Sequence, residues 1–411
     1  MAARPGKRLH RMFIFKNAAP ASPRSRCFIA RASILLACSS LTGLTPAHAQ
    51  DAAVPAAEPV AKPEPAQPAS APAPDDIARW LAGIHVNAEA LAAFSLVPSW
   101  KAHANALDAA WAQSESQRIA KVRSWAPDAL GEACTADSPV FYFFSGGDFL
   151  YPHALFPNAK TYVLCAREPV GSQPDPARIP AGELPGALST FRKSLSALLD
   201  FSFFITKNLR KDVGQRHIPG ILPVLELILV REGAQLSEVQ LVHCDDSGAI
   251  STDAKAKDGS PGVRIKFRMG EQPGQTLYYF YGDLSNGGLK THGGVLKFCE
   301  TLGNGRSLLK AASYLPHIGE FSRINEWLLD HSSAILQDTS GIPYRQFPKD
   351  KWKFRFWGHN AQPIGIFKKY AEHDLQEAVN AAPATRIPFG FGYQHEPANS
   401  LLILAERAPA N

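Results

Sequence analysis

Polar residues suited to binding or catalysis follow the first strand-like run of the chain. The run Val140–Phe144 is apolar and has the length of a strand, and Ser145, Gly146, Gly147 and Asp148 come directly after it. Glycines at this point let a ligand approach the backbone, and the carboxylate of Asp148 could accept hydrogen bonds from hydroxyl groups or act as a base. The other interpretation is a tight turn in which Asp148 caps a helix. The segment is therefore a candidate ligand site or a turn.

Glu168 closes the next apolar run, Thr161–Cys165, and lies 22 residues after Gly146. Nucleotide-binding folds often place a carboxylate near this spacing, where it accepts hydrogen bonds from a ribose. Over about 30 residues the layout resembles the first unit of Rossmann-like methyltransferases and dehydrogenases, although the order G-x-G-x-x-G is absent. The resemblance implies a ligand beyond the carboxyl ends of the strands, with Glu168 among its contacts. The sequence indicates no particular cofactor.

A second set of polar residues follows three later strand-like runs. It consists of Asp283, Asn286, His317, Asp338 and Ser340. If these runs belong to one parallel sheet, their loops meet the segment 145–148 at the same edge. The side chains that could then act as acids, bases or ligands of a hard metal ion are Asp148, Asp283, His317 and Asp338. Each of these residues also suits a structural role in a loop or a helix cap, so both interpretations remain.

Motifs that would define a particular reaction are missing from the sequence. It contains neither G-x-S-x-G, the nucleophile motif of α/β-hydrolases, nor H-E-x-x-H, the zinc motif of metalloproteases. The run 243–246 (His-Cys-Asp-Asp) could supply metal ligands, but on a hairpin edge it more often forms a turn. The aromatic run 278–281 could stack on sugars, although its composition is also that of ordinary sheet packing.

The spacing of apolar residues predicts an α/β fold. Helices are expected over 76–93, 99–125, 321–330 and 371–381, with a further helix that follows the loop 283–288 and runs through Glu300, and mainly helical structure over 182–230. Strands are expected over 140–144, 161–165, 239–243, 263–268, 277–281, 307–311, 334–337, 352–357 and 401–404. The first two strands read as a parallel pair, and the next three read as hairpins. We expect a Rossmann-like sheet with a hairpin insert and an N-terminal helical extension over 75–130; a mixed α+β domain is the alternative.

Several segments resemble those of a family of uncharacterised exported bacterial proteins. They are Phe143–Tyr151, Phe156–Ala159, Ile335–Tyr344 and Pro388–Tyr393. The resemblance implies a single domain that covers most of residues 135–407. It implies no activity.

The N-terminus has the composition of a signal peptide. Residues 1–31 are basic, residues 32–44 are apolar, and Ala47-His48-Ala49 matches an A-x-A cleavage site. We expect export to the periplasm or the medium after cleavage near Ala49. A lipoprotein signal with an acylated Cys38 and a buried helix are the alternatives.

Residues 50–74 form an expected disordered linker, with nine Ala and seven Pro in 25 residues. Without the eight basic residues of the signal peptide, 35 Lys and Arg stand against 37 Asp and Glu, so the net charge changes from +6 to −2. This balance argues against a nucleic-acid partner. No apolar run reaches the length of about 18 residues that a transmembrane helix requires, so none is expected in the mature chain.

Four cysteines remain in the exported part of the chain, at positions 134, 165, 244 and 299. They allow three pairings, among which the sequence does not choose. One structural disulfide and a set of buried free thiols are both compatible with the pattern.

Two functions are compatible with these patterns. The first is an exported cell-envelope protein whose single domain, residues 75–407, binds a polar envelope ligand or acts as a scaffold. The second is an envelope enzyme that uses its Asp and His residues for acid–base or metal-assisted chemistry. A pocket that gathers carboxylates with raised pKa values would favour the enzyme.

Overall fold

The computed structural model describes residues 71–204, 209, 211–253, 258–383 and 385–408, which belong to one compact unit. The predicted signal peptide, residues 1–49, lies outside the described residues. So does the predicted linker, apart from residues 71–74. The first helix begins at Pro74, the last residue assigned to that linker.

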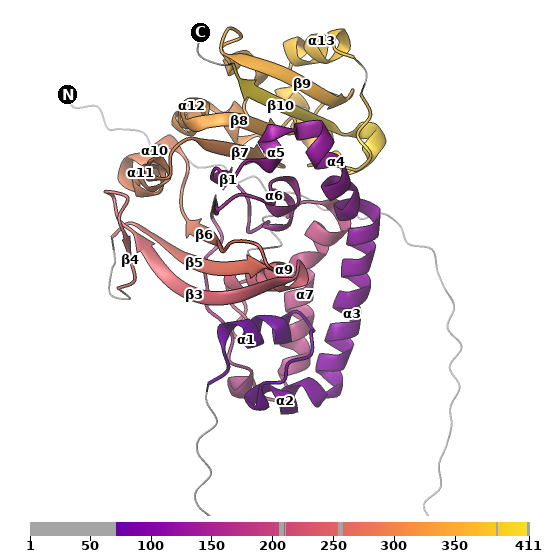
Figure 1. Ribbon diagram of the computed structural model, residues 1–411, viewed down its shortest axis with the longest axis vertical. Coiled ribbons are helices and arrows are strands. Elements are labelled where there is room, and N and C mark those ends of the chain that lie inside the picture. The colour runs from indigo at the N-terminus through magenta and orange to yellow at the C-terminus, as the bar shows by residue number, and fades with distance from the viewer. Residues whose placement is uncertain (1–70, 205–208, 210, 254–257, 384, 409–411) are drawn as a thin grey trace, which may run out of the picture. The chain divides into compact units, whose positions relative to one another are not determined.

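The described part of the chain forms a ten-stranded sheet in the order β4-β3-β5-β6-β2-β1-β7-β8-β10-β9 (Figure 1). The strands are β1 (Val140–Phe143), β2 (Thr161–Ala166), β3 (Ala234–Cys244), β4 (Ile250–Ser251), β5 (Ser260–Met269), β6 (Gln275–Tyr281), β7 (Gly305–Leu309), β8 (Ser332–Gln337), β9 (Trp352–Gly358) and β10 (Leu401–Arg407). The protein is therefore an α/β protein with a large mixed sheet.

The five central strands, β6-β2-β1-β7-β8, are parallel. The outer pairings are antiparallel. On one side β6 pairs with β5, β5 with β3 and β3 with β4, and on the other side β10 pairs with β8 and β9. The expected parallel pair of β1 and β2 is present, and so are the hairpin pairings of β3 with β5 and of β5 with β6. From β1 the sheet grows through β2 and β6 on one side, and β7 and β8 then add on the other. The order of the strands thus reverses between β1 and β7.

Both faces of β1 are buried, which explains its continuous apolar sequence. In β1, Val140 and Tyr142 belong to one hydrophobic core, and Phe141 and Phe143 belong to the other. Because side chains alternate along a strand, an apolar residue at every position supplies both cores at once. The alternation also leaves no solvent-exposed face on which the sequence could have shown polar residues.

Helices cover both faces of the sheet. They are α1 (Pro74–Leu81), α2 (Glu89–Leu96), α3 (Pro98–Ser114), α4 (Ala120–Leu130), α5 (Glu132–Thr135), α6 (Leu150–Leu155), α7 (Leu184–Phe201), α9 (Leu222–Arg231), α10 (Asn286–Thr291), α11 (Gly294–Thr301), α12 (Ser322–His331) and α13 (His373–Ala381). A π-helical turn, η1 (Glu115–Ile119), joins α3 to α4, and short 3₁₀ turns occur at Pro176–Arg178, Leu315–His317, Gly319–Phe321, Tyr344–Gln346, Gly365–Tyr370 and Pro397–Asn399. None of the described helices is long and apolar enough to cross a membrane.

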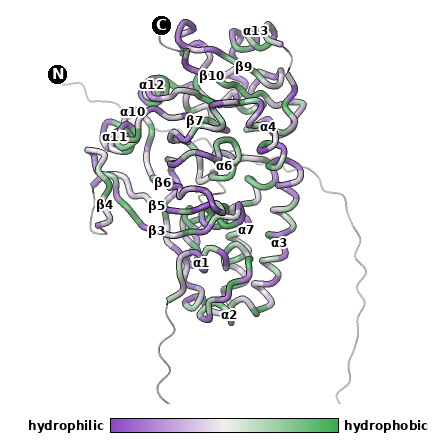
Figure 2. Tube along the Cα trace, in the orientation of Figure 1, coloured by the Kyte–Doolittle hydropathy of each residue, from purple (hydrophilic) through white to green (hydrophobic). Residues whose placement is uncertain are grey.

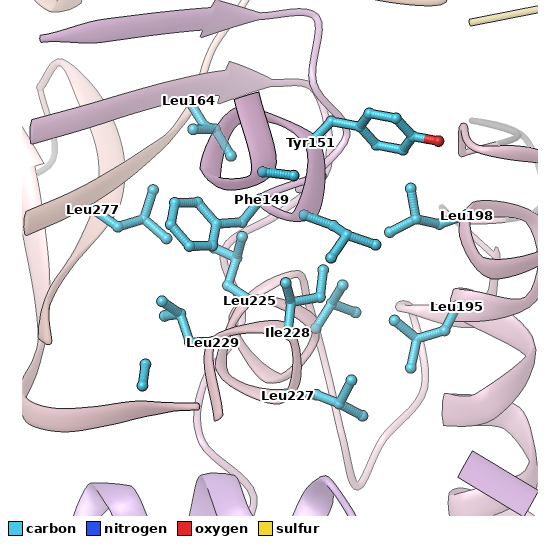
Figure 3. Close-up of a cluster of buried hydrophobic side chains, with 14 of the residues drawn as sticks. Phe149, Tyr151, Leu164, Leu195, Leu198, Leu225, Leu227, Ile228, Leu229 and Leu277 are labelled. Carbon is cyan, nitrogen blue, oxygen red and sulfur yellow. The ribbon is translucent and has the colours of Figure 1, made fainter. Parts of the chain in front are cut away.

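One core lies between the sheet and the helices α6, α7 and α9. Phe149, at the start of α6, lies among Leu164 of β2, Leu277 of β6 and the leucines of α9, and α7 adds Leu195 (Figure 3). The second core lies on the opposite face, where α11 and α12 pack. In Figure 2, green and purple alternate along α3, as expected for a helix with one buried face.

The helical extension differs from its prediction at one point. The expected helix 76–93 is two helices, α1 and α2, because Gly83 takes a left-handed backbone conformation (φ +69°) just after α1. There the backbone amides of Gly83 and Ile84 donate to the carbonyls of Trp80 and Arg79, which ends the helix. The expected helix 99–125 continues through η1 and α4 to Leu130.

Candidate functional site

A pocket of about 320 Å³ lies where the order of the strands reverses, at the carboxyl ends of β6, β2, β1 and β7. Its lining residues are Tyr142, Phe144, Ser145, Gly146, Asp148, Ala166, Arg167, Glu168, Phe203, Phe204, Gly282, Asp283, Leu284, Lys310, Ala311, Ala312, Ser313, Leu315 and Phe321. In open α/β sheets this edge is the usual place for a ligand, because several loops diverge there and leave a crevice.

The loop after β1 forms one wall of the pocket through Ser145, Gly146 and Asp148. Gly146 and Gly147 have φ values of +61° and +88°, which glycine adopts without strain. Gly147 faces the protein instead of the pocket, since a Cβ on it would lie 2.3 Å from Cγ1 of Ile221. The backbone amide of Tyr151 donates to Oδ1 of Asp148 at 3.3 Å, so the carboxylate does contact the first turn of α6, as the turn-and-cap interpretation expected.

A buried ion pair joins two lining residues, Asp148 and Lys310. Nζ of Lys310 lies 2.9 Å from Oδ2 of Asp148, and both side chains are 1% exposed. The hydroxyl of Tyr142 donates to the same oxygen at 3.1 Å. Burial lowers the pKa of Lys310 and the nearby Asp148 carboxylate raises it, with lowering the net direction. Sequence reasoning missed Lys310, because no local pattern marks this lysine as a site residue.

Arg167, Glu168 and Asp283 also line the pocket. Arg167 and Asp283 form an ion pair with 3.0 Å between Nη1 and Oδ2. Oδ1 of Asp283 also accepts a hydrogen bond from the backbone amide of Ser285 at 3.0 Å, which shapes the loop after β6. Glu168 is 2% exposed, and its backbone carbonyl accepts a hydrogen bond from the hydroxyl of Tyr279 at 2.7 Å. The pocket lining thus contains two of the predicted carboxylates, Glu168 and Asp283.

Aromatic side chains form much of the remaining wall. Phe144 follows β1, Phe321 precedes α12, and Phe203 and Phe204 follow α7. The rings of Phe144 and Phe321 pack edge-on with their centroids 5.8 Å apart. Sequence reasoning missed these residues because phenylalanine is common in cores, and only the path of the chain brings these four to one surface.

Asp338 and Ser340 do not line the pocket but support the loop that does. Oδ1 of Asp338 accepts from the amide of Ser340 at 2.9 Å and Oδ2 from the amide of Ala311 at 3.0 Å. Oγ of Ser340 accepts from the amide of Ala312 at 2.8 Å. Burial raises the pKa of Asp338, and these hydrogen bonds oppose the rise. The two residues therefore hold the loop after β7 from the side of β8.

His317 and Asn286 are also absent from the pocket lining. Nε2 of His317 donates to the carbonyl of Thr339 at 3.2 Å, and burial lowers the pKa of its imidazole to about 4. The amide of Asn286 donates to the carbonyl of Gly319 and to Oγ of Ser322, both at 3.1 Å. Of the four candidate catalytic residues, the pocket thus brings together Asp148 and Asp283 and leaves His317 and Asp338 outside.

The described residues contain no group of three or more His, Cys, Asp or Glu side chains arranged to hold a metal ion. The four cysteines at 134, 165, 244 and 299 are buried free thiols, and the structure contains no disulfide among these four residues. Burial raises the pKa of Cys165 to about 12, which makes this thiol a packing residue.

In comparisons with known proteins, no family model, no curated protein and no solved structure matches the chain. The function must therefore be argued from the pocket itself.

Proposed function

We propose that the chain is an exported cell-envelope protein with a Rossmann-like domain that binds a small ligand carrying adjacent hydroxyl groups on a ring, such as a nucleoside or a sugar. The observation that carries the proposal is the pocket at the strand-order reversal, with Glu168, which follows β2, in its lining. In dinucleotide-binding folds a carboxylate near this position accepts hydrogen bonds from ribose hydroxyls.

The size and walls of the pocket support a small ligand. Its volume of about 320 Å³ is at the lower end for small-molecule sites. Phe203 and Phe204 offer an apolar surface for the flat side of a ring, while the carboxylates of Glu168 and Asp283 suit its hydroxyl groups. A mainly apolar lining with a few polar groups is typical of ligand sites in general.

The alternative proposal, an enzyme that uses an Asp/His cluster, has less support. His317 is hydrogen-bonded to a backbone carbonyl outside the pocket, and Asp338 uses its carboxylate on three backbone and side-chain donors. Burial raises the pKa of the Asp338 carboxyl, but this residue does not line the pocket. We therefore favour binding over catalysis.

Titration calorimetry with adenosine, 2′-deoxyadenosine and methyl ribofuranoside tests the proposal. Adenosine should bind, and removal of the 2′-hydroxyl should weaken binding about tenfold, because the lost bond is made to a charged acceptor. Glu168→Gln should weaken adenosine binding by a similar factor. Equal affinity for adenosine and the riboside would show that the sugar alone is recognised.

Glu238→Gln is the matched control, since Glu238 is a carboxylate of β3 that pairs with Arg264 and Lys266 away from the pocket lining. It should bind adenosine as the unmodified protein does. The proposal would be overturned if neither adenosine nor the riboside bound at millimolar concentration, or if Glu168→Gln had no more effect than the control.

A further inference from the structure

The C-terminal end of α7 is held by two buried cations. The guanidinium of Arg118 donates to the carbonyls of Leu198, Leu199 and Asp200, at 3.4 Å for Leu198 and 3.1 Å for Asp200. The ammonium group of Lys310 donates to the carbonyl of Ser202, the residue that follows the helix. Because the last carbonyls of a helix have no partners within it and carry partial negative charge, cations at this point stabilise the helix end.

Arg118 reaches this position from the π-helical turn η1, within the long helix that runs from α3 to α4. Turns of this kind are rare and frequently occur at functional sites, because the wider turn redirects a side chain. Only 6% of Arg118 is exposed, and Oγ of Ser114 accepts one of its remaining hydrogen bonds at 3.3 Å. Burial of a guanidinium is costly unless its donors are used; here three hydrogen bonds from the two terminal nitrogens end on α7, and Nε has no hydrogen-bond partner among the described residues.

The segment held in this way leads directly into the pocket wall. Ser202 has a φ of +83° and donates through Oγ to the carbonyl of Gly392 at 3.1 Å. The next two residues, Phe203 and Phe204, line the pocket. Phe203 packs edge-on against Tyr393 with 4.9 Å between ring centroids. The direction in which the chain leaves α7 therefore decides where both rings lie.

Lys310 contacts the opposite wall as well. Its ammonium group pairs with Asp148 in the loop after β1 and donates to Ser202 after α7. A Cβ on Gly146, in the same loop as Asp148, would lie 3.4 Å from the ring of Phe204, so the two walls approach each other there. One side chain thus links the polar wall of the pocket to its aromatic wall.

We propose that Arg118 and Lys310 are positioning residues of the pocket. Arg118 holds the end of α7 so that Phe203 and Phe204 form the aromatic wall, and Lys310 fixes the distance between that wall and the loop that carries Asp148. The ligand-binding part of this inference rests on the proposed function, whereas the placement of the wall does not.

The test compares Arg118→Met and Lys310→Met with Arg306→Met. Arg306 is the matched control because it is also a buried guanidinium bound to backbone carbonyls, those of Ala133 and Ser138, and does not line the pocket. Hydrogen exchange is measured on two peptides, residues 195–204 and 143–149. Adenosine affinity is measured on the same proteins.

Arg118→Met should speed exchange in 195–204 about tenfold, since a bond to a charged donor is lost, and Lys310→Met should speed exchange in both peptides. Arg306→Met should change neither. Adenosine affinity should fall about tenfold in the first two variants, and Arg118→Lys, which keeps a cation, should restore part of it. If Arg118→Met does not fold, Arg118→Lys still gives the exchange pattern.

Exchange in 195–204 that matches the unmodified protein in both variants would overturn the proposal. So would faster exchange with unchanged adenosine affinity, because the wall would then not matter for the ligand. If the unmodified protein does not bind adenosine, the proposed function fails, and the exchange pattern alone decides whether the two cations position the wall.

Discussion

Lys310 and Asp148 show how a charge can be kept in a core. Each side chain is 1% exposed, and an isolated charge at such a depth would cost several kcal/mol. Lys310 offsets this cost with a carboxylate, a backbone carbonyl and the ring of Tyr151, whose centroid lies 4.0 Å from Nζ. Asp148 in turn accepts from Tyr142 and Tyr151. The pair therefore behaves as one unit, and removing one member leaves the other charge buried.

Lys310→Met should lower the free energy of unfolding by about 3–5 kcal/mol, because it leaves the Asp148 carboxylate buried without its cation. The double variant Lys310→Met/Asp148→Asn should recover most of that loss, since neither charge then remains. Urea unfolding of the two variants measures the difference. A double variant no more stable than the single one would contradict the pairing.

Glu372 makes stability depend on pH. Burial raises the pKa of its carboxyl to about 7, with a smaller rise from Asp374 and a lowering by Arg345. Nε2 of His317 lies 4.0 Å from Oε1, and the backbone amide of Tyr344 donates to Oε2 at 2.9 Å. The folded protein thus binds the proton of Glu372 more tightly than the unfolded chain, whose value is 4.5. This contribution is present in full below about pH 4.5 and is lost as the pH rises to about 7.

Glu372→Gln keeps the acceptor and removes the ionisation. We compare the variant with the unmodified protein by the difference between their free energies of unfolding. This difference should shift by about 2 kcal/mol toward a more stable variant between pH 5 and pH 8. Urea unfolding at both pH values measures this. Because the pKa of His317 is lowered to about 4, the contribution of this imidazole to stability rises with pH, and it should persist in the variant. If the difference in stability between the variant and the unmodified protein were the same at pH 5 and pH 8, the raised pKa of Glu372 would be contradicted.

At the scale of elements, the connection from β1 to α6 is a tightly turned part of the pocket wall. Three of its residues have a positive φ: Phe144 at 62°, Gly146 at 61° and Gly147 at 88°. A turn this tight lets Asp148 reach back to the strand end and forward to Tyr151. The geometry of the wall is thus set by backbone conformation before any side chain contributes.

Gly147→Ala should destabilise the protein by about 1–3 kcal/mol, because alanine is strained at positive φ and its Cβ would lie 2.3 Å from Ile221. Gly186→Ala is the contrasting variant: Gly186 lies in α7, nothing would lie within 4 Å of its Cβ, and alanine favours helix. It should stabilise the protein by about 0.5–1 kcal/mol. Thermal unfolding of both variants measures these changes in stability. Destabilisation by Gly186→Ala would contradict the expected gain in helix propensity.

At the scale of the whole molecule, the sequence and the structure address different parts of the chain. The compact unit accounts for the described residues from 71 onward, whereas the features that predict export lie before them. The proposed place of action therefore depends on sequence alone, and the proposed pocket depends on the fold.

The mature protein should begin at Gln50. This follows from the A-x-A site at Ala47–Ala49 after the apolar core of the signal peptide. Intact-mass measurement of the protein from an exporting host, with the host's signal peptidase blocked as the control, tests the prediction. An acylated Cys38 at the N-terminus would instead identify a lipoprotein, and an unprocessed Met1 in the exported fraction would contradict cleavage.

The sequence by itself determined the α/β class, the parallel pair of β1 and β2, and the hairpins around β5. These follow from local patterns: an apolar run of strand length needs no knowledge of distant residues, and turn-forming residues between such runs limit how they pair. The same patterns located the loop at 145–148 and Glu168, both of which line the pocket.

Only the tertiary structure decided which loops share a surface. Strand order places the ends of β6, β2, β1 and β7 around one pocket and leaves the turn after β8 behind it, so Asp283 lines the pocket while Asp338 supports it from outside. Lys310, Phe203 and Phe204 carried no local pattern that marks a site. Their roles arise from contacts between residues far apart in the chain, such as Lys310 with Ser202, and those contacts depend on how helices and strands stack, which short-range periodicity does not encode.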